Sequence, residues 1–304
     1  MTTNIALVIG NGFDLDLGLL TRYSDFADPK NKEWNDFLNM TGTILKRMFP
    51  IEFVEHMRNA RIYENWFDIE EEILKFANKH INLSKTQISL IKQQYEALVQ
   101  CLRQYIYRQT VSTKIKVDSL ANVLVHKLSE TPHPVGIYTY NYTNCIKLCG
   151  CKKRDYFSIH PIHGMLLSDD IVLGCRIYNG SKKNEQLEFL YKPTVDIQKE
   201  ILKQNLTQAT ETIIFGHSLN KMDACYFKDF FEDIEKGTQN CKHLTFICKD
   251  AKSEGMIKRN LQDYVNLSNV ERNVDIKYIY TDLWNIKDPI TLQIYNDLCQ
   301  RIDL

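Results

Sequence analysis

The chain has 304 residues, of which 44% are hydrophobic and 25% charged, and its 38 basic residues balance 38 acidic ones. These fractions are typical of a globular protein and exclude the disordered, collagen-like and coiled-coil classes. A net charge of zero gives no general attraction to nucleic acid or to an anionic membrane, so neither partner is expected. The sequence has no apolar run long enough for a transmembrane helix, and its first residues lack the basic region and cleavage site of a signal peptide. We expect a cytoplasmic protein.

The first predicted element is a buried strand. Residues 4–9 form a short apolar run that ends at a glycine-containing turn. Because a strand covered on both faces is apolar throughout, this run predicts a central strand of a parallel sheet.

A helical block follows from about residue 33 to residue 129. Its apolar residues recur three and four positions apart, as in Trp34, Phe37 and Leu38. Ser84 is a good N-cap for a long helix that ends near Thr110. We interpret residues 33–129 as a helical insertion.

Strand patterns return in the rest of the chain and alternate with helical patterns. This alternation predicts an α/β fold with a mostly parallel sheet, in which residues 1–32 and 130–304 form the core around the insertion. Ligands of such sheets bind at the carboxyl ends of the strands. The predicted strands are Val135–Tyr140, Ile171–Cys175, Thr212–Phe215, Leu244–Cys248 and Ile276–Tyr280, and the predicted helices are 197–209, 222–235, 251–264 and 290–301.

The nine cysteines favour free thiols in a reducing compartment, because a disulfide framework is usually even in number and denser. Cys145, Cys149 and Cys151 precede two histidines, but their spacing lacks the repeated pairs of a zinc site. Small apolar residues near a strand end are the favoured interpretation, and no metal is expected.

A glycine-containing turn comes directly after the first strand. Its residues are Gly10, Asn11, Gly12, Phe13 and Asp14. Glycines at such a place let backbone amides approach a phosphate at the N-terminus of a helix. The third glycine of the dinucleotide fingerprint is replaced by Leu15, so a simple tight turn is an equal alternative. The Asp14 carboxylate would repel a pyrophosphate unless it faces away, caps the helix or binds a ribose hydroxyl.

Polar residues also follow the strand at 135–140. Thr139 and Asn141 lie where a side chain can face a ligand, and an asparagine can orient a hydroxyl group or a water molecule. The alternative role for Asn141 is an Asx turn. His163, followed by Gly164, can act as a base near neutral pH. A lone histidine is, however, more often a surface or core residue.

A second glycine-containing turn follows the strand at 212–215. Gly216, His217 and Ser218 would lie at the same edge of the sheet as the first turn and bind the other end of a nucleotide, or Ser218 and Asp223 would simply cap the next helix. The segment also resembles the nucleophile elbow of serine hydrolases. The final glycine of that motif is missing, and too little chain remains before the last histidine, so a serine hydrolase is disfavoured.

The helical block contains the acidic motif Trp66, Asp68 and Glu70. Alternate residues do not share a face of a helix, so the motif is either a solvated acidic surface or an extended segment that leads into a helix at Glu70. Together with Asp14 and Asp16, these carboxylates could bind Mg²⁺ in a nuclease. The neutral net charge argues against that alternative.

Taken in order, these segments resemble the AbiH-type phage abortive-infection proteins. The similarity covers residues 4–231 and rests on the following positions: Gly10–Leu15, Gly18, Leu19, Thr21, Tyr23, Phe26, Trp66, Asp68, Glu70, Thr139–Tyr142, His163, Gly164, Gly216–Leu219 and Asp223. The same pieces are more distantly similar to the sirtuin-like NAD-binding fold of bacterial defence NADases.

This second resemblance implies a Rossmann-like nucleotide-binding core that hydrolyses NAD, with Asn141 and His163 as the catalytic residues. The implied binding residues are Gly10, Asn11, Gly12, Phe13, Asp14, Thr139, Gly216, His217, Ser218 and Asp223. Asp14 and Thr143 depart from the sirtuin pattern and favour the alternative of a nucleotide-binding sensor of phage defence that lacks catalysis. A phage-derived trigger and a second copy of the chain are the other partners that we expect.

Overall fold

The computed structural model of the chain describes residues 4–39, 52–63, 68–152, 155–166, 171–177, 182–193 and 196–304. Trp66, named above, lies outside these residues. The strands are β1 (Ile5–Ile9), β2 (Val135–Thr139), β3 (Phe157–Pro161), β4 (Glu211–Phe215), β5 (His243–Cys248) and β6 (Asp275–Tyr280). The helices are α1 (Asn11–Asp16), α2 (Tyr23–Phe26), α3 (Lys32–Asn39), α4 (Glu52–Tyr63), α5 (Ile69–Lys79), α6 (Lys85–Ser112), α7 (Leu120–Glu130), α8 (Cys145–Leu148), η3 (Glu185–Leu190), α9 (Asp196–Gln208), α10 (Ala224–Lys236), α11 (Ala251–Gln262), α12 (Leu267–Asn273), α13 (Thr281–Asn285) and α14 (Pro289–Asp303).

The six strands form one parallel sheet in the order β3-β2-β1-β4-β5-β6. This is the strand order of the Rossmann fold, so the predicted α/β class is confirmed. Every residue of β1 is buried, as its unbroken apolar sequence predicted. β1 lies at the centre of the sheet, between β2 and β4.

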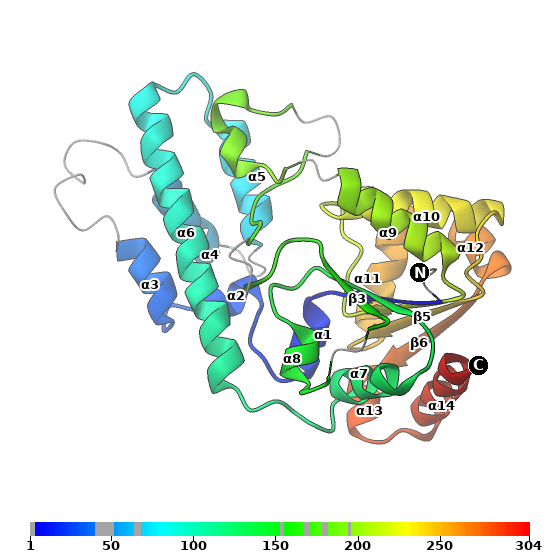
Figure 1. Cartoon of the computed structure of the whole chain (residues 1–304). Helices are drawn as coiled ribbons and strands as arrows, with labels where there is room; N and C mark the ends of the chain where they lie inside the picture. The colour runs from blue at the N-terminus through cyan, green and yellow to red at the C-terminus, as the bar shows by residue number, and fades with distance from the viewer. Residues whose placement is uncertain are drawn as a thin grey trace. The chain divides into compact units, whose positions relative to one another are not determined.

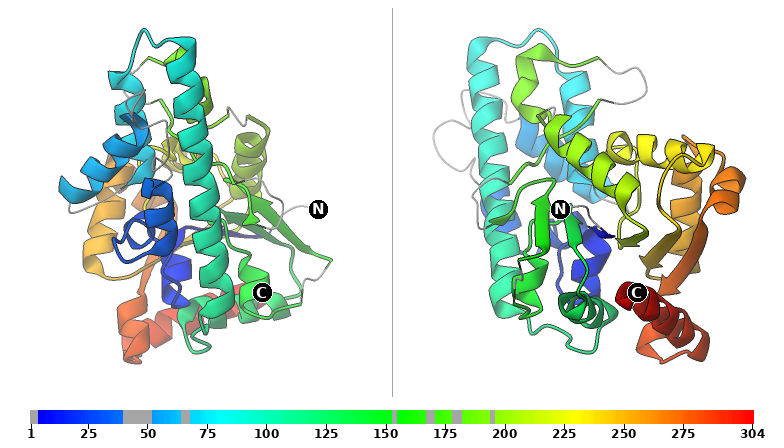
Figure 2. Two further views of the ribbon diagram at one scale, coloured as in Figure 1. Left: turned by 90° about the vertical axis from the view of Figure 1, so that its left-hand side faces the viewer. Right: turned by 45° about the vertical axis from the view of Figure 1, so that its right-hand side comes forward.

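Helices cover both faces of the sheet (Figure 1). One core joins side chains of the strands to α1, α7, α8, α13 and α14, and the other joins them to α9, α10, α11 and α12. The views in Figure 2 show α7 and α14 on one side of the strands and α9 and α10 on the other. This three-layer arrangement buries both faces, which a parallel sheet requires.

The chain divides into two compact units, here called the sheet unit and the helical unit. The sheet unit contains residues 1–19, 113–168 and 195–304, and the helical unit contains 20–112 and 169–194. Most of the block predicted as an insertion therefore lies in the helical unit. The structure adds residues 20–32 and 169–194 to that unit, and it gives 113–129, with most of α7, to the sheet unit.

Two local predictions about strands were wrong. Ile171–Cys175 is not a strand, because Gly174 has a φ of 148° and only an isolated bridge between Cys175 and Tyr191 forms. Leu173 and Cys175 of this segment are buried within the helical unit instead. The sequence pattern also missed β3, an edge strand that contains Ser and His and ends in Pro, which weakens any strand signal.

The helical unit confirms the interpretation of two polar residues. The Ser84 hydroxyl accepts a hydrogen bond from the Gln87 amide at the start of α6 (3.3 Å), as an N-cap does. Asp68 has an extended backbone and caps α5. Glu70 then pairs with the buried amine of Lys192, with its Oε2 2.7 Å from Nζ, and accepts a hydrogen bond from Tyr23. Asp68 is thus the extended residue that leads into α5, and Glu70 is not part of a solvated acidic face.

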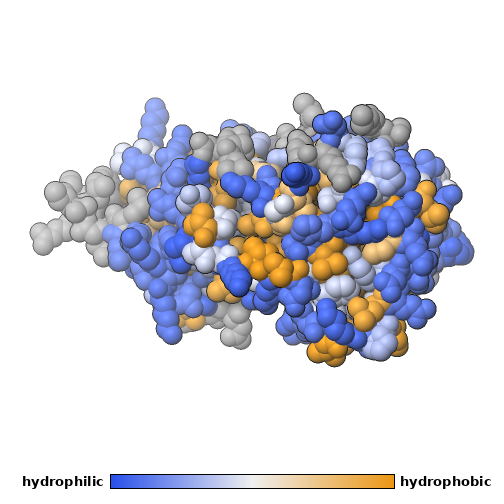
Figure 3. Space-filling model, turned by 60° about the horizontal axis from the view of Figure 1, so that its bottom comes forward, coloured by the Kyte–Doolittle hydropathy of each residue, from blue (hydrophilic) through white to orange (hydrophobic). Residues whose placement is uncertain are grey.

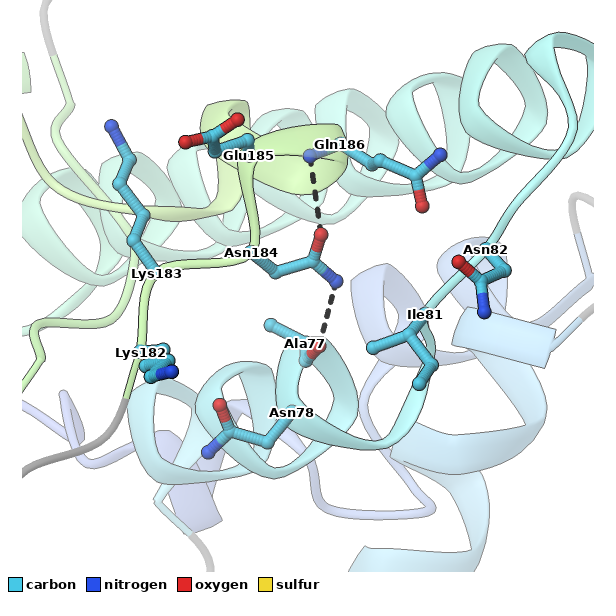
Figure 4. Close-up of a pocket in the computed structure, with 9 residues that line it drawn as sticks. All are labelled: Ala77, Asn78, Ile81, Asn82, Lys182, Lys183, Asn184, Glu185 and Gln186. Carbon is cyan, nitrogen blue, oxygen red and sulfur yellow. Dashed lines mark hydrogen bonds between the residues drawn. The ribbon is translucent and has the colours of Figure 1, made fainter.

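A pocket of about 590 Å³ lies within the helical unit, between the end of α5 and the start of η3 (Figure 4). Asn184 shapes it by donating hydrogen bonds to the carbonyl groups of Ala77 (2.9 Å) and His80 (2.6 Å) and accepting one from the Gln186 amide (3.1 Å). None of the residues singled out from the sequence lines this pocket.

On the face drawn in Figure 3, hydrophilic residues predominate and apolar residues form several smaller patches. Within the described ranges, none of the helices combines the length and the apolar character that crossing a membrane requires.

Candidate functional site

The carboxyl ends of four strands bring the predicted site residues to one edge of the sheet unit. Ile9 at the end of β1 pairs with Thr139 on β2 and with Phe215 on β4. Gly10 and Gly216 follow these ends directly, Asn141 comes two residues after the end of β2, and His163 comes two residues after the end of β3. The chain changes direction across the sheet between β1 and β4, which is the switch point where open α/β sheets bind ligands.

The two glycine-containing turns contact each other through their backbones. The Gly12 amide donates a hydrogen bond to the Gly216 carbonyl (2.9 Å), and the Gly10 amide donates one to the Phe215 carbonyl (2.9 Å). A Cβ atom on Gly12 would lie 2.6 Å from the Gly216 Cα atom. Gly216 also has a φ of 64°, which favours glycine. Packing between the turns therefore explains why glycine occupies positions 12 and 216.

This contact changes the role expected for the first turn. The Gly10 and Gly12 amides bind carbonyl groups of the second turn, and the Phe13 amide donates to the Gly10 carbonyl (3.0 Å). Three amides that were expected to face a pyrophosphate are thus already used inside the chain. We therefore base the functional interpretation on the side chains beside this turn and not on its backbone amides.

Asp14, Asn141 and Thr143 form a buried polar group. Asn141 Nδ2 donates hydrogen bonds to Asp14 Oδ1 (2.9 Å) and to the Gly10 carbonyl (3.1 Å). The Thr143 hydroxyl contacts both carboxyl oxygens of Asp14 at 2.9 Å. The backbone N–H of Asn141 also donates a hydrogen bond to the Thr139 hydroxyl (3.1 Å). Asn141 is therefore held by its nitrogen, and its oxygen remains the atom that can accept a hydrogen bond from a ligand or a water molecule.

Burial raises the pKa of Asp14 to about 7, although the hydrogen bonds from Thr143 and Asn141 oppose this shift. A buried carboxylate loses its hydration, so the protonated form is favoured in the folded state. Asp14 neither caps α1 nor extends into solvent, because it faces Asn141 and Thr143. Asp14 and Thr143, the two residues that depart from the sirtuin pattern, therefore contact each other.

We expect the free energy of unfolding of the wild-type chain to fall more steeply between pH 4 and pH 7 than that of Asp14→Asn. The folded pKa of Asp14 lies above the unfolded value of about 4. Its stabilisation is complete below pH 4 and is lost as the pH rises through 7, with a slope of up to about 1.4 kcal/mol per pH unit. Urea unfolding followed by circular dichroism at several pH values measures the difference. Thr143→Val is the control, because it keeps the carboxyl group and should keep the steep slope. Equal slopes in wild type and Asp14→Asn would contradict the assignment.

A second group joins two histidines through one carboxylate. Asp223 Oδ1 lies 3.4 Å from His163 Nε2, and Asp223 Oδ2 lies 3.4 Å from His217 Nε2. All three side chains are buried. Asp223 occupies the N-cap position of α10, but its side chain makes no capping hydrogen bond. The alternative that the Asp223 carboxylate caps this helix was therefore wrong, and neither is Ser218 the N-cap.

Tyr140 contacts both histidines of the second group. Its ring centroid lies 5.1 Å from that of His163 and 4.4 Å from that of His217. Tyr140 directly precedes Asn141 in the chain, so both residues come just after the carboxyl end of β2. Sequence reasoning missed Tyr140, since an aromatic residue at a strand end is ordinarily part of the core.

The carboxylates considered for a metal-dependent nuclease each have a partner within the chain. Asp16 accepts a hydrogen bond from the Ala121 amide (2.8 Å), and Asp68 accepts one from the Glu70 amide (2.9 Å). In the part of the chain that the structure describes, no three His, Cys, Asp or Glu side chains are grouped to hold a metal. Burial raises the pKa of Cys145 to about 12, which keeps this thiol protonated. The geometry gives the nuclease alternative no support.

Comparison with models of known protein families gives a match over most of the chain. The family model described as "Bacteriophage abortive infection AbiH" matches residues 6–243, which include every residue of the two polar groups. None of the curated proteins compared with the chain matches it. Because the matched region covers well over half of the sequence, the chain belongs to the AbiH family of bacteriophage abortive-infection proteins.

Proposed function

We propose that this AbiH protein acts in abortive infection by hydrolysing the bond between nicotinamide and ribose in NAD. The observation that carries the proposal is that Asn141, hydrogen-bonded to the buried Asp14 carboxyl group, and His163, 3.4 Å from the buried Asp223, follow strand ends of a sheet with Rossmann strand order. An anchored amide oxygen and an imidazole are the groups that a water-dependent cleavage of this bond needs. The distant resemblance to sirtuin-like defence NADases supports the choice of NAD.

The charges of the two groups also fit this substrate. The side chains of Asp14, Asn141 and Thr143 and those of His163, His217 and Asp223 include two carboxyl groups and no lysine or arginine. Such a neighbourhood suits a cationic ring better than an anion. The nicotinamide ring of NAD is cationic while it is attached to ribose.

In the proposed reaction the bond between ribose C1′ and the nicotinamide nitrogen breaks, and its electron pair neutralises the pyridinium ring. The ring leaves without protonation, so no general acid is needed. The ribose passes through an oxocarbenium-like state, as in glycoside hydrolysis. Asn141 Oδ1 orients a water molecule whose oxygen attacks C1′, and His163 accepts the proton of that water. The products are ADP-ribose, nicotinamide and one proton, which His163 releases to solvent.

The test is nicotinamide release. Cells that express the wild-type chain or Asn141→Ala are infected with phage, and cellular NAD, nicotinamide and ADP-ribose are followed by chromatography. The purified chain is then incubated with NAD, with and without extract from infected cells, because an abortive-infection NADase must stay silent before infection. We expect equal amounts of nicotinamide and ADP-ribose from the wild type only. NAD that is bound but never cleaved would support the sensor alternative and overturn the proposal.

A further inference from the structure

The orientation of His217 is fixed by the backbone of its own turn. His217 Nδ1 accepts a hydrogen bond from the Leu219 amide at 3.0 Å. A ring nitrogen that accepts a hydrogen bond carries no proton, so the proton of the neutral ring lies on Nε2. That nitrogen is the one that faces Asp223 Oδ2. The positive φ angles of Gly216 (64°) and Leu219 (53°) shape the turn that makes this contact.

The contact with Asp223 likewise indicates which ring nitrogen of His163 carries the proton. An ionised carboxylate only accepts hydrogen bonds, so an imidazole nitrogen that faces it carries a proton. His163 Nε2 lies 3.4 Å from Asp223 Oδ1, a buried acceptor that makes no hydrogen bond within the described part of the chain and that a proton on Nε2 would serve. In the neutral His163 ring, the basic lone pair is then on Nδ1. The His217 imidazole is held in place by the rings of Tyr140 and Phe227, whose centroids lie 4.4 Å and 5.1 Å from its own.

We infer that His217 and Asp223 are positioning residues that fix His163 as the Nε2–H tautomer and thereby make Nδ1 the base. The inference rests on the proposed function for its catalytic meaning. His217 orients the Asp223 carboxylate, and Asp223 orients His163 and stabilises the imidazolium formed when Nδ1 takes a proton from water. A carboxylate beside a catalytic histidine has this role in other hydrolases. The assignment replaces the ligand-binding roles expected from the sequence for His217 and Asp223.

The tautomers can be measured without substrate. In the full chain labelled with ¹⁵N-histidine, long-range ¹H–¹⁵N spectra distinguish protonated from unprotonated ring nitrogens, and His163→Gln and His217→Gln assign the signals. We expect both rings as Nε2–H tautomers in the wild type. In Asp223→Asn, whose amide can donate to Nε2, we expect His163 to shift towards the Nδ1–H tautomer. Asp275→Asn is the matched control, since Asp275 lies 3.5 Å from His243 at the opposite end of β5 and should alter only the His243 signals.

Kinetics complete the test. We expect kcat for NAD cleavage to fall about 10–100-fold in His217→Asn with little change in KM, which is the usual loss when a residue that orients a metal-binding side chain is replaced. In Asp223→Asn we expect kcat to fall further. Asp275→Asn should cleave NAD like the wild type. If the spectra show the Nδ1–H tautomer of His163 in the wild type, or no change in Asp223→Asn, the inference is overturned even where NAD is cleaved. If the tautomers are as expected but no nicotinamide is ever released, the proposed function fails and the tautomer assignment stands.

Discussion

His163→Gln and Asn141→Ala are each expected to lower the rate of nicotinamide release from NAD by about 10²–10⁴-fold, the usual contribution of a general base or of a group that positions the nucleophile. Glutamine fills part of the space of His163 but cannot accept a proton from water. Alanine at position 141 removes the amide oxygen and leaves Asp14 and the Gly10 carbonyl without their Nδ2 donor. Chromatographic measurement of nicotinamide over time gives both rates.

His160→Gln is the matched control for these two variants. His160 lies on β3, three residues before His163, and stacks on Tyr138 with ring centroids 5.0 Å apart. Because it belongs to the strand and not to either polar group, its replacement should leave the rate within about twofold. Circular dichroism confirms that each variant is folded. Unchanged turnover in both His163→Gln and Asn141→Ala would remove the proposed mechanism.

The sequence alone predicts the parts of the fold that repeat a simple pattern. The unbroken apolar run of β1 and the alternation of strands with helices after it indicate a parallel sheet, and the structure has one. The rule that ligands bind at carboxyl strand ends then directs attention to the residues after β1, β2 and β4. These predictions need only local periodicity and a general rule of topology.

Contacts between distant residues could not be predicted in this way. The pairing of Asp14 with Asn141 joins residues that are 127 positions apart. For Asp14 the sequence left open that it faces away from a phosphate, caps the helix, binds a ribose hydroxyl or binds Mg²⁺. Likewise, Asp223 sits at the start of a helix, where capping is the ordinary role of an aspartate. The other role becomes visible only in the structure, where His163 and His217 come within 3.4 Å of the two Asp223 carboxyl oxygens.

The glycines illustrate how one pattern can have two physical causes. A glycine after a strand lets a backbone approach a phosphate, and it equally lets two backbones approach each other. Gly12 and Gly216 do the second, since each would place a Cβ atom within 2.6 Å of the other's Cα atom. No pattern within either turn could distinguish these causes, because the deciding atoms belong to the other turn.

Gly216→Ala is expected to lower the free energy of unfolding by about 2–5 kcal/mol. An alanine with a φ near 64° costs roughly 1–2 kcal/mol. Its Cβ atom would lie 2.4 Å from the Gly12 Cα atom and 2.5 Å from the Phe13 amide nitrogen, and overpacking of this kind costs about 1–3 kcal/mol more. Both neighbours are backbone atoms, so no side chain can rotate away to relieve the contact. Urea unfolding at constant pH measures the loss.

Two further glycines separate the causes of this effect. Gly150→Ala keeps the positive φ of 66° but has no atom within 4 Å of the new Cβ, so it should show the backbone cost alone, about 1–2 kcal/mol. Gly12→Ala adds the 2.6 Å contact with Gly216 Cα and should destabilise through that contact. If Gly12→Ala and Gly216→Ala unfold like the wild type and instead weaken NAD binding, the turns exist to admit a phosphate, and packing is not the reason for their glycines. If both variants lower the free energy of unfolding more than Gly150→Ala does, the contact between the turns after β1 and β4 holds Asp14 and His217 in register. Any ligand must then bind beside this contact.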